Sequence, residues 1–245
     1  MSESFVHEAY EELLGLPDAP VVLSCEHASP RLPEPYRWHA DDGWLAGTHW
    51  AYDLGARAFT LELARALSAN AVLSRFTRLL VDPNRELGRA DMFRERADGK
   101  PVQLNAELDD TQRAARIERY YQPFHAALDQ AIARSGAPLL LSIHSFTPTY
   151  EGVVRDVEIG VLFNRDDEPG RDMLAALSAQ LPNVRENEPW SGKQGLIYSA
   201  ESHAERFDKI ALELEVRQDR LENRDYRAQL VPVVADFVRR RFGAG

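Results

Sequence analysis

The chain has 245 residues, of which 44% are hydrophobic and 28% charged, and its formal net charge is −10. This size and composition are ordinary for a soluble protein, and we expect a single domain over residues 1–245. The acidic excess argues against a surface built to bind nucleic acid or an anionic membrane. A net acidic charge is nevertheless compatible with a local basic pocket that binds a small anion.

Cysteine content and hydropathy indicate a cytoplasmic setting. Cys25 is the only cysteine, so no intrachain disulfide can form, and the first residues lack the basic and apolar regions of a secretory signal. The longest apolar runs have the length of strands, far short of the ~20 residues that span a bilayer. We therefore expect a reducing, cytoplasmic environment and no membrane-spanning segment.

The first half of the chain alternates strand and helix patterns. Pro20–Cys25 is strand-like and runs into a proline-rich loop, which cannot continue as a regular helix. Asp53–Leu67 carries apolar residues at helical spacing, and Ala71–Leu73 followed by Thr77–Val81 predicts one or two strands. Residues 86–109 are polar and predict a long surface loop, of a kind that often covers a site.

The second half continues the alternation. Helices are expected at Thr111–Ser135, Asp172–Leu181, Ala200–Arg206 and Tyr226–Phe242, and strands at Pro138–Ile143, Val157–Phe163 and Ile210–Val216. Strands that alternate with helices form a sheet whose two faces are both covered. The sequence therefore predicts the α/β class, as a three-layer α/β/α domain with a mixed, mostly parallel sheet.

Three apolar runs each reach a residue that can bind metal or carry protons at their carboxyl ends. These residues are His27, His144 and Glu215. In open α/β sheets the carboxyl ends of parallel strands face the ligand crevice, so the three side chains are expected to share one site. Either histidine could equally hydrogen-bond the end of its strand and nothing more.

Glu26 and Ser145, the sequence neighbours of the two histidines, have possible roles of their own. Glu26 could be a carboxylate that orients an imidazole or simply a surface charge. Strand alternation turns it away from His27, which favours a surface or structural role. Ser145 follows His144, but adjacent residues of an extended chain point apart and no Gly-x-Ser-x-Gly elbow surrounds it. A serine hydrolase is therefore disfavoured, and Ser145 remains a candidate for substrate binding at the rim.

His49 and Asp53 are four residues apart. If the helix begins this early, both side chains share one face and could contribute a metal ligand. Catalytic zinc takes three protein ligands, from imidazole or carboxylate, and keeps an open position for water. The alternative makes Asp53 a helix cap and His49 a surface residue.

Arginines gather around the segment that ends in Asp82. Arg75, Arg78 and Arg85 lie there with Asn84, and a guanidinium group can grip a carboxylate in two parallel hydrogen bonds. We consider these four residues candidates for substrate binding. Asp82 could instead pair with the arginines internally.

The last predicted strand combines acids with an arginine. Alternation places Glu213, Glu215 and Arg217 on one face. A desolvated Glu215 beside a metal could take a proton from bound water and pass it to a leaving amine, and Arg217 is a further candidate for substrate binding. The alternative is an ordinary amphipathic edge strand with salt bridges.

Six segments spread over most of the chain resemble the N-formylglutamate amidohydrolase family, whose fold resembles that of zinc carboxypeptidases and aspartoacylase. They are CEHASPRLP at 25–33, HWAYDLGA at 49–56, SRFTRLLVDPNR at 74–85, RIERYYQPFHAAL at 116–128, SIHS at 142–145 and LELEVRQD at 212–219. Their order and spacing together are more specific than any one of them.

The resemblance implies a zinc hydrolase that cuts an amide, such as that of N-formyl-L-glutamate. It implies zinc ligands at His27 and His144, a general base at Glu215, and a carboxylate site at Asn84 and Arg85 with Arg75 or Arg78. Carboxypeptidases use His-x-x-Glu, whereas Pro30 stands third after His27, so the remaining ligand is expected at His49 or Asp53. This departure indicates a divergent branch.

Two other functions stay open at this point. One is a non-catalytic anion-binding module that uses Arg75, Arg78 and Arg85, and the other is a metal-free hydrolase that uses His144 and Glu215. The expected partner is a small carboxylate-bearing substrate, not nucleic acid or membrane.

Overall fold

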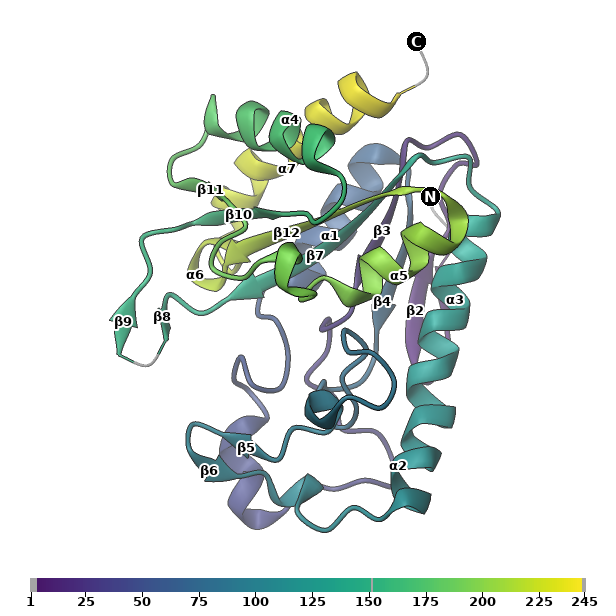
Figure 1. Ribbon diagram of the computed structural model, residues 1–245, viewed down its shortest axis with the longest axis vertical. Coiled ribbons are helices and arrows are strands. Elements are labelled where there is room, and N and C mark those ends of the chain that lie inside the picture. The colour runs from purple at the N-terminus through teal and green to yellow at the C-terminus, as the bar shows by residue number, and fades with distance from the viewer. Residues whose placement is uncertain (1–3, 151, 244–245) are drawn as a thin grey trace.

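The computed structural model describes residues 4–150 and 152–243, and its centre is an eight-stranded sheet in the order β1-β2-β4-β3-β7-β12-β10-β11 (Figure 1). The strands are β1 (Ser4–Val6), β2 (Tyr10–Leu13), β3 (Val21–Cys25), β4 (Asn70–Ser74), β7 (Leu139–Phe146), β10 (Ile159–Leu162), β11 (Val184–Glu186) and β12 (Ile210–Arg217). Two small ribbons, β5 (Arg96–Ala97) with β6 (Lys100–Pro101) and β8 (Thr149–Tyr150) with β9 (Val153–Val154), lie outside this sheet.

The middle of the sheet is parallel. β4, β3, β7 and β12 pair in parallel, whereas β2 and β10 flank them antiparallel. All four central strands therefore end at the same edge. The register of β7 and β12 sets His144 beside Glu215, so strand pairing alone brings two of the predicted site residues together.

Helices cover both faces of the sheet. They are α1 (Ala56–Leu67), α2 (Asp110–Arg116), the π-helical turn η4 (Ile117–Tyr121), α3 (Gln122–Ala133), α4 (Asp167–Ser178), α5 (Tyr198–Phe207), α6 (Gln218–Leu221) and α7 (Arg224–Phe242). Four 3₁₀ turns complete the described elements: η1 (Ala40–Leu45), η2 (Ala90–Met92), η3 (Gln103–Asn105) and η5 (Gly192–Gln194). None of the helices in residues 4–150 and 152–243 is long and apolar enough to cross a membrane.

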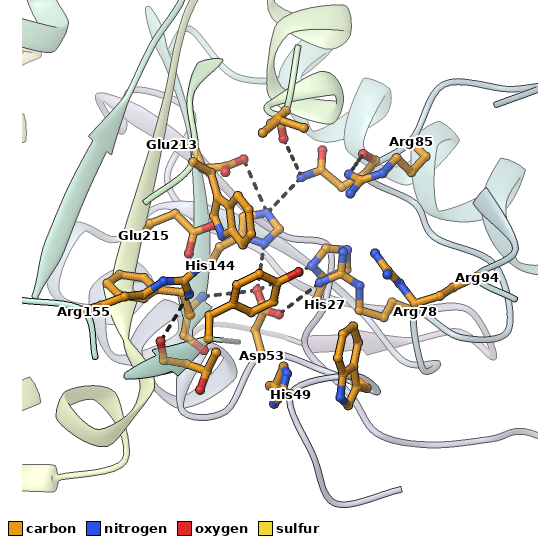
Figure 2. Close-up of a pocket in the computed structure, with 18 residues that line it drawn as sticks. His27, His49, Asp53, Arg78, Arg85, Arg94, His144, Arg155, Glu213 and Glu215 are labelled. Carbon is orange, nitrogen blue, oxygen red and sulfur yellow. Dashed lines mark hydrogen bonds and ion pairs between the residues drawn. The ribbon is translucent and has the colours of Figure 1, made fainter. Parts of the chain in front are cut away.

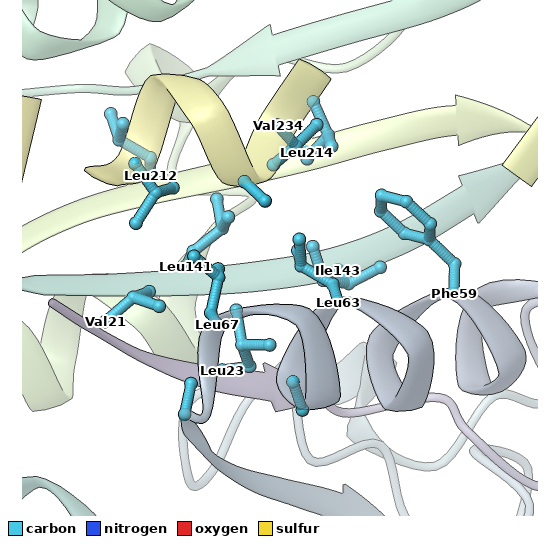
Figure 3. Packing of buried hydrophobic residues seen from close by; sticks show 14 of the residues in the cluster. Val21, Leu23, Phe59, Leu63, Leu67, Leu141, Ile143, Leu212, Leu214 and Val234 are labelled. Atoms are coloured by element: carbon cyan, nitrogen blue, oxygen red, sulfur yellow. The ribbon is translucent and has the colours of Figure 1, made fainter. Parts of the chain in front are cut away.

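The two hydrophobic cores follow from strand alternation. Leu141 and Leu212 point to one face, where they pack with Phe59 and Leu63 of α1 and Val234 of α7 (Figure 3). Alternate residues of the same strands point to the other face, against α3 and α5. Because both faces are buried, the strands read as continuous apolar runs. The predicted three-layer α/β/α architecture with a mostly parallel sheet is confirmed.

Several predicted element boundaries need correction. Helix α1 begins at Ala56, because Gly55 adopts φ +80° and packs so closely that a Cβ would lie 2.6 Å from Leu221. The strand predicted at Thr77–Val81 is wrong: this segment is a turn whose backbone bonds to loops, including Arg78 N to Ala51 O at 3.1 Å. Its apolar side chains are buried, which explains the strand-like pattern.

Other differences are smaller. Helix α4 starts five residues before the predicted Asp172, at Asp167. The short strands β1, β2 and β11 were not predicted. The helix expected at Thr111–Ser135 spans α2 to α3 and begins with a capping box between Asp109 and Gln112. Residues 86–109 form the expected long loop, which holds only 3₁₀ turns and the β5–β6 ribbon.

Candidate active site

A pocket of about 260 Å³ lies at the edge where the central parallel strands end. Strand β7 supplies His144 to its floor, and β12 supplies Glu213 and Glu215. The loop after β3 supplies His27, and the loop before α1 supplies Asp53 (Figure 2). The arrangement follows the general rule that α/β sheets bind ligands beyond the carboxyl ends of their strands.

His27, Asp53 and His144 form a cluster that could hold a metal ion. Each offers one ligand atom, and these atoms lie within 4.8 Å of one another. Asp53 Oδ2 is 3.4 Å from His27 Nδ1 and 2.8 Å from His144 Nδ1. All three residues are buried. Two imidazole nitrogens and a carboxylate that converge in this way are a ligand set that suits zinc.

The backbone holds Asp53 in place. Its amide donates to His27 O at 2.9 Å, and its Oδ2 accepts from the Ser145 amide at 3.1 Å. Asp53 thus lies in an ordered loop ahead of α1, and it does not share a helix face with His49. The i, i+4 argument for these two residues was therefore wrong, although Asp53 does reach the histidines.

Carboxylates orient the far nitrogen of each histidine. Asp82 Oδ1 lies 2.7 Å from His27 Nε2, and Glu26 Oε2 lies 3.1 Å from His144 Nε2. Glu213 Oε2 is 3.5 Å from His144 Nε2 as well. Such outer carboxylates fix the tautomer and the ring orientation of metal-binding histidines. Both Nδ1 atoms are consequently left to face Asp53.

The cluster passes a simple test of fit to a cation. His27 Nδ1 is buried and makes no hydrogen bond within the described residues. Burial would lower the pKa of His144, but the charge of Glu213 and the bonds to Asp53 and Glu26 outweigh it and raise that pKa well above its usual value. Burial opposes ionisation of Asp53 too, yet the two histidines lower its pKa. The site is thus built to stabilise positive charge.

The pKa values of Glu213 and Glu215 are raised, in contrast to that of Asp53. Burial raises the pKa of Glu213 to about 8 and that of Glu215 to about 7. One carboxylate oxygen of each, Oε2, is buried with no hydrogen-bond partner among the described residues. Carboxyl groups with such pKa values can exchange a proton near neutral pH.

Four guanidinium groups of the described residues line the pocket, and they fall into two classes. Arg78 pairs with Asp82 at 2.8 Å and with Asp53 at 3.5 Å, and Arg85 pairs with Asp91 at 2.9 Å. Arg94 and Arg155 form no ion pair with any carboxylate in residues 4–150 and 152–243. Asp82 thus neutralises an arginine internally, as one reading of the sequence proposed.

The remaining predicted site residues divide between the pocket and its surroundings. Asn84 lines the pocket, with Nδ2 3.5 Å from His144 Nε2. His49 lines it too, but it stands outside the metal-ligand cluster, and burial followed by the charge of Arg78 lowers its pKa. Ser145 is at the pocket wall, where its hydroxyl donates to Leu54 O at 2.8 Å.

Arg75 and Arg217 do not line the pocket. The Arg75 guanidinium donates to His7 O at 2.6 Å and so ties down the N-terminal segment. The Arg217 guanidinium bonds to Asp219 at 2.8 Å and to Arg155 O at 3.0 Å. Because its ion-pair partner Asp219 lies in α6, the Arg217 guanidinium is held outside the pocket lining.

Other residues differ from the favoured sequence reading or did not stand out in it. Glu26 lies outside the pocket lining and is fully buried, not at the surface: its side chain meets Ser142 of the neighbouring β7 at 2.7 Å and also contacts His144, as the less favoured reading of Glu26 had it. Arg94 and Arg155 carry no local signal, since every basic residue except Lys100, Lys193 and Lys209 is an arginine. The pocket also contains four aromatic side chains, of which Phe146 and Tyr150 come from β7 and β8 and Trp50 and Trp190 from loops.

Three solved structures resemble this chain to different degrees. The gene product Atu2144 from Agrobacterium tumefaciens is 29% identical, with a TM-score of 0.87 over 96% of this chain and 94% of that one. The tripeptide-bound cell shape determinant Csd4 from Helicobacter pylori shares the fold at 12% identity and a TM-score of 0.52, over 91% of this chain and 51% of its own. A metallo-carboxypeptidase from Burkholderia cenocepacia matches at 15% identity and a TM-score of 0.42, over 94% and 59% of the two chains.

The sequence matches no curated protein. It does match a family model described as N-formylglutamate amidohydrolase, over residues 19–221. The match includes every residue of the candidate site, from His27 to Glu215. It agrees with the resemblance carried by the six sequence segments, and the chain belongs to the N-formylglutamate amidohydrolase family.

Proposed function

We propose that the protein is a zinc-dependent amidohydrolase that cleaves the N-acyl amide, such as an N-formyl amide, of a small carboxylate-bearing substrate. Family membership supports the amidohydrolase class. The observation that carries the metal-dependent mechanism is the convergence of His27, Asp53 and His144 in the pocket that Glu215 also lines.

The metal would be held by His27 Nδ1, His144 Nδ1 and Asp53 Oδ2. This choice assigns the third ligand to Asp53 and leaves His49 in the pocket wall. Zinc in such a site lowers the pKa of a bound water toward ~7 and polarises a carbonyl oxygen. Asp82 and Glu26 would keep the two rings in the orientation that presents Nδ1.

Glu215 is the proposed proton carrier. Its carboxylate takes a proton from the attacking water as the water oxygen bonds to the amide carbon. It then gives that proton to the leaving nitrogen as the carbon–nitrogen bond breaks, so the products are a carboxylic acid and an amine. In the metal-free protein burial raises the pKa of Glu215 to about 7, which supports a carboxyl group that can both accept and release a proton.

Asn84, Arg85 and Arg94 are the proposed binding groups for the substrate carboxylate. Asn84 and Arg85 follow from the family resemblance, and Arg94 adds a charge that no described carboxylate neutralises. The Arg94 guanidinium stacks on the Trp50 ring, 5.3 Å from its centroid, and both residues line the pocket. Arg78, which already pairs with Asp82 and Asp53, is better suited to holding those acids in place.

The test combines metal analysis with a Glu215→Gln variant. We expect near one zinc per purified chain and hydrolysis of N-formyl or N-acetyl amino acids. Glu215→Gln should lower kcat by about 10²–10⁴-fold, a typical contribution of a general acid–base group, while zinc remains bound. Glu222→Gln, a change at an exposed residue after the same strand, is the matched control and should retain activity.

Other outcomes would overturn the proposal. Full turnover by Glu215→Gln would exclude Glu215 as the proton carrier. Hydrolysis by protein that is free of metal would favour a metal-free mechanism with His144 and Glu215. Binding of carboxylates without hydrolysis of any N-acyl amino acid would favour an anion-binding module.

A further inference from the structure

Arg155 stands apart from the other pocket arginines in position and in its contacts. It precedes β10 and lies near Glu215, whereas Arg85 and Arg94 lie on the other side of the two histidines (Figure 2). Its guanidinium donates one hydrogen bond, to Thr147 O at 3.2 Å. It forms no ion pair with the carboxylates of residues 4–150 and 152–243.

Aromatic rings hold the Arg155 guanidinium. Its central carbon lies 4.9 Å from the ring centroids of Tyr150 and Trp190, and 5.6 Å from that of Phe146. Tyr150 and Trp190 also contact each other edge to face, at 5.8 Å. All four residues line the pocket. Three rings from three segments of the chain therefore fix the direction of one cation.

An aromatic frame of this kind holds a cation without cancelling its charge. Contact with ring faces attracts a guanidinium group and leaves its N–H donors available, whereas a carboxylate would neutralise it. Burial lowers the pKa of Arg155 although the charge of Glu215 opposes this shift, so water has been partly removed around a guanidinium that forms no ion pair with a described carboxylate. An anion that entered the pocket would relieve this cost.

We infer that Arg155 is a specificity-determining residue that binds an anionic group, a carboxylate, at the end of the substrate farthest from Arg85 and Arg94. The inference rests on the proposed function for the identity of the pocket as a substrate site. It differs from that function in assigning a recognition role to a residue outside the ligand and carboxylate-binding segments named so far. Phe146, Tyr150 and Trp190 act as positioning residues for its guanidinium.

A purely structural role for Arg155 predicts a different effect of its substitution on ligand binding. If Arg155 only tied the β8–β9 ribbon to the Trp190 segment, its loss would weaken every ligand equally. If it recognises charge, its loss should affect only ligands that carry the negative group in the right place. Arg155→Met keeps an extended side chain against the rings and removes the charge, and Arg155→Lys keeps the charge and loses the planar donors.

The experiment measures equilibrium binding by calorimetry, in a Glu215→Gln background that prevents turnover. The ligands are N-formyl-L-glutamate and its two monoamides, in which either carboxylate is replaced by a neutral group of the same shape. We expect the Glu215→Gln protein, the parent in this experiment, to bind the diacid about 10–100-fold more tightly than each monoamide. This ratio corresponds to the usual contribution of a hydrogen bond to a charged group. Arg155→Met should abolish the preference for the diacid over one of the monoamides and leave the preference over the other monoamide unchanged. Arg155→Lys should retain part of each preference.

The control is Arg240→Met, which removes an exposed arginine that pairs with Asp236 on α7. It should leave all three affinities unchanged. Equal weakening of all ligands by Arg155→Met, or survival of both preferences, would overturn the inference, as would a parent that binds all three ligands alike. Binding does not depend on turnover, so an absence of hydrolysis by the Glu215 enzyme would count against the proposed function alone.

Discussion

Two close histidine pairs lie within the described residues, and they differ in what their nitrogens face. His27, His144 and His203 are buried, and His125 is half-buried. His27 and His144 meet edge to face with ring centroids 4.7 Å apart, and both Nδ1 atoms point at Asp53. His125 and His203 are stacked at 5.0 Å, and His125 Nδ1 lies 2.7 Å from His203 Nε2. In the second pair, one ring nitrogen of each histidine is therefore hydrogen-bonded to the other histidine.

The surrounding carboxylates explain the difference in charge. Four acids, namely Glu26, Asp53, Asp82 and Glu213, lie within 3.5 Å of the first pair. The second pair has Asp129, 2.6 Å from His203 Nδ1, at one end. Burial, with the charge of His203, lowers the pKa of His125 to about 3, whereas the pKa of His144 is raised. The acids around His144 thus outweigh the effect of its burial, whereas at His125 the charge of His203 adds to the effect of burial.

The largest expected effect separates the pairs by metal content. His27→Ala or His144→Ala should reduce the zinc content from near one per chain to near none and abolish hydrolysis, because each removes one of three protein ligands. His203→Gln, at a histidine that is equally buried, should keep the metal. Elemental analysis of the three purified variants is the measurement. Zinc retained by His144→Ala, or lost from His203→Gln, would show that the metal is held elsewhere.

A smaller effect is expected from the acid behind His27. Asp82→Asn should weaken zinc binding by about 10–100-fold without removing the site, because an outer carboxylate only orients its histidine and raises the basicity of that ring. Asp129→Asn, the matching change behind His203, should leave zinc affinity unchanged. Competition with a chelator of known affinity measures both. If the Asp82→Asn variant and the unmodified protein bound zinc with equal affinity, Asp82 would have no role in metal binding.

The smallest effect is on stability at low pH. Because the pKa of His125 is lowered to about 3 from about 6.5 in the unfolded chain, folding favours its neutral form. Its contribution is therefore present above about pH 6.5 and is lost as the pH falls toward 3, by about 2 kcal/mol at pH 5. The pKa of His144 is raised, so in the metal-free protein its contribution has the opposite sign and is lost as the pH rises.

Urea unfolding of the metal-free protein between pH 7.5 and 5 tests this sign. His125→Gln cannot titrate, so its free energy of unfolding should depend less steeply on acid than that of the parent. His39→Gln, a change at an exposed histidine, should follow the parent at every pH. Parallel curves for His125→Gln and the parent would mean that His125 is not held neutral by the fold.

Strand ends were the most informative part of the sequence. His27, His144 and Glu215 could be grouped in advance because each follows or lies in an apolar run of strand length, and parallel strands end at a common edge. The central strands and most helices were also recognisable, since a buried strand or an amphipathic helix repeats its apolar residues at a fixed period. The turn at 77–81 shows the limit, because buried apolar residues in a loop imitate a strand.

Long-range partners were not recognisable in this way. Spacing left His49 and Asp53 equivalent, and only the loop ahead of α1 shows which of them meets the histidines. For Glu26 a surface or structural role was favoured over one in orienting an imidazole, because alternation along its own strand says nothing about the neighbouring strand, where its carboxylate contacts Ser142 and His144. Arg78 and Arg85 stood out by position, yet both already have acidic partners.

The sequence by itself determined the layers of the fold, the edge at which the site forms, and the three residues that anchor it. These properties depend on periodicity and on the ends of strands, which are local. Tertiary structure alone decided which acid joins the histidines, which carboxylates contact their far nitrogens, and which pocket arginines form no ion pair with a described carboxylate. Those outcomes depend on distances between residues up to 118 positions apart, as for Glu26 and His144, and no local pattern encodes them.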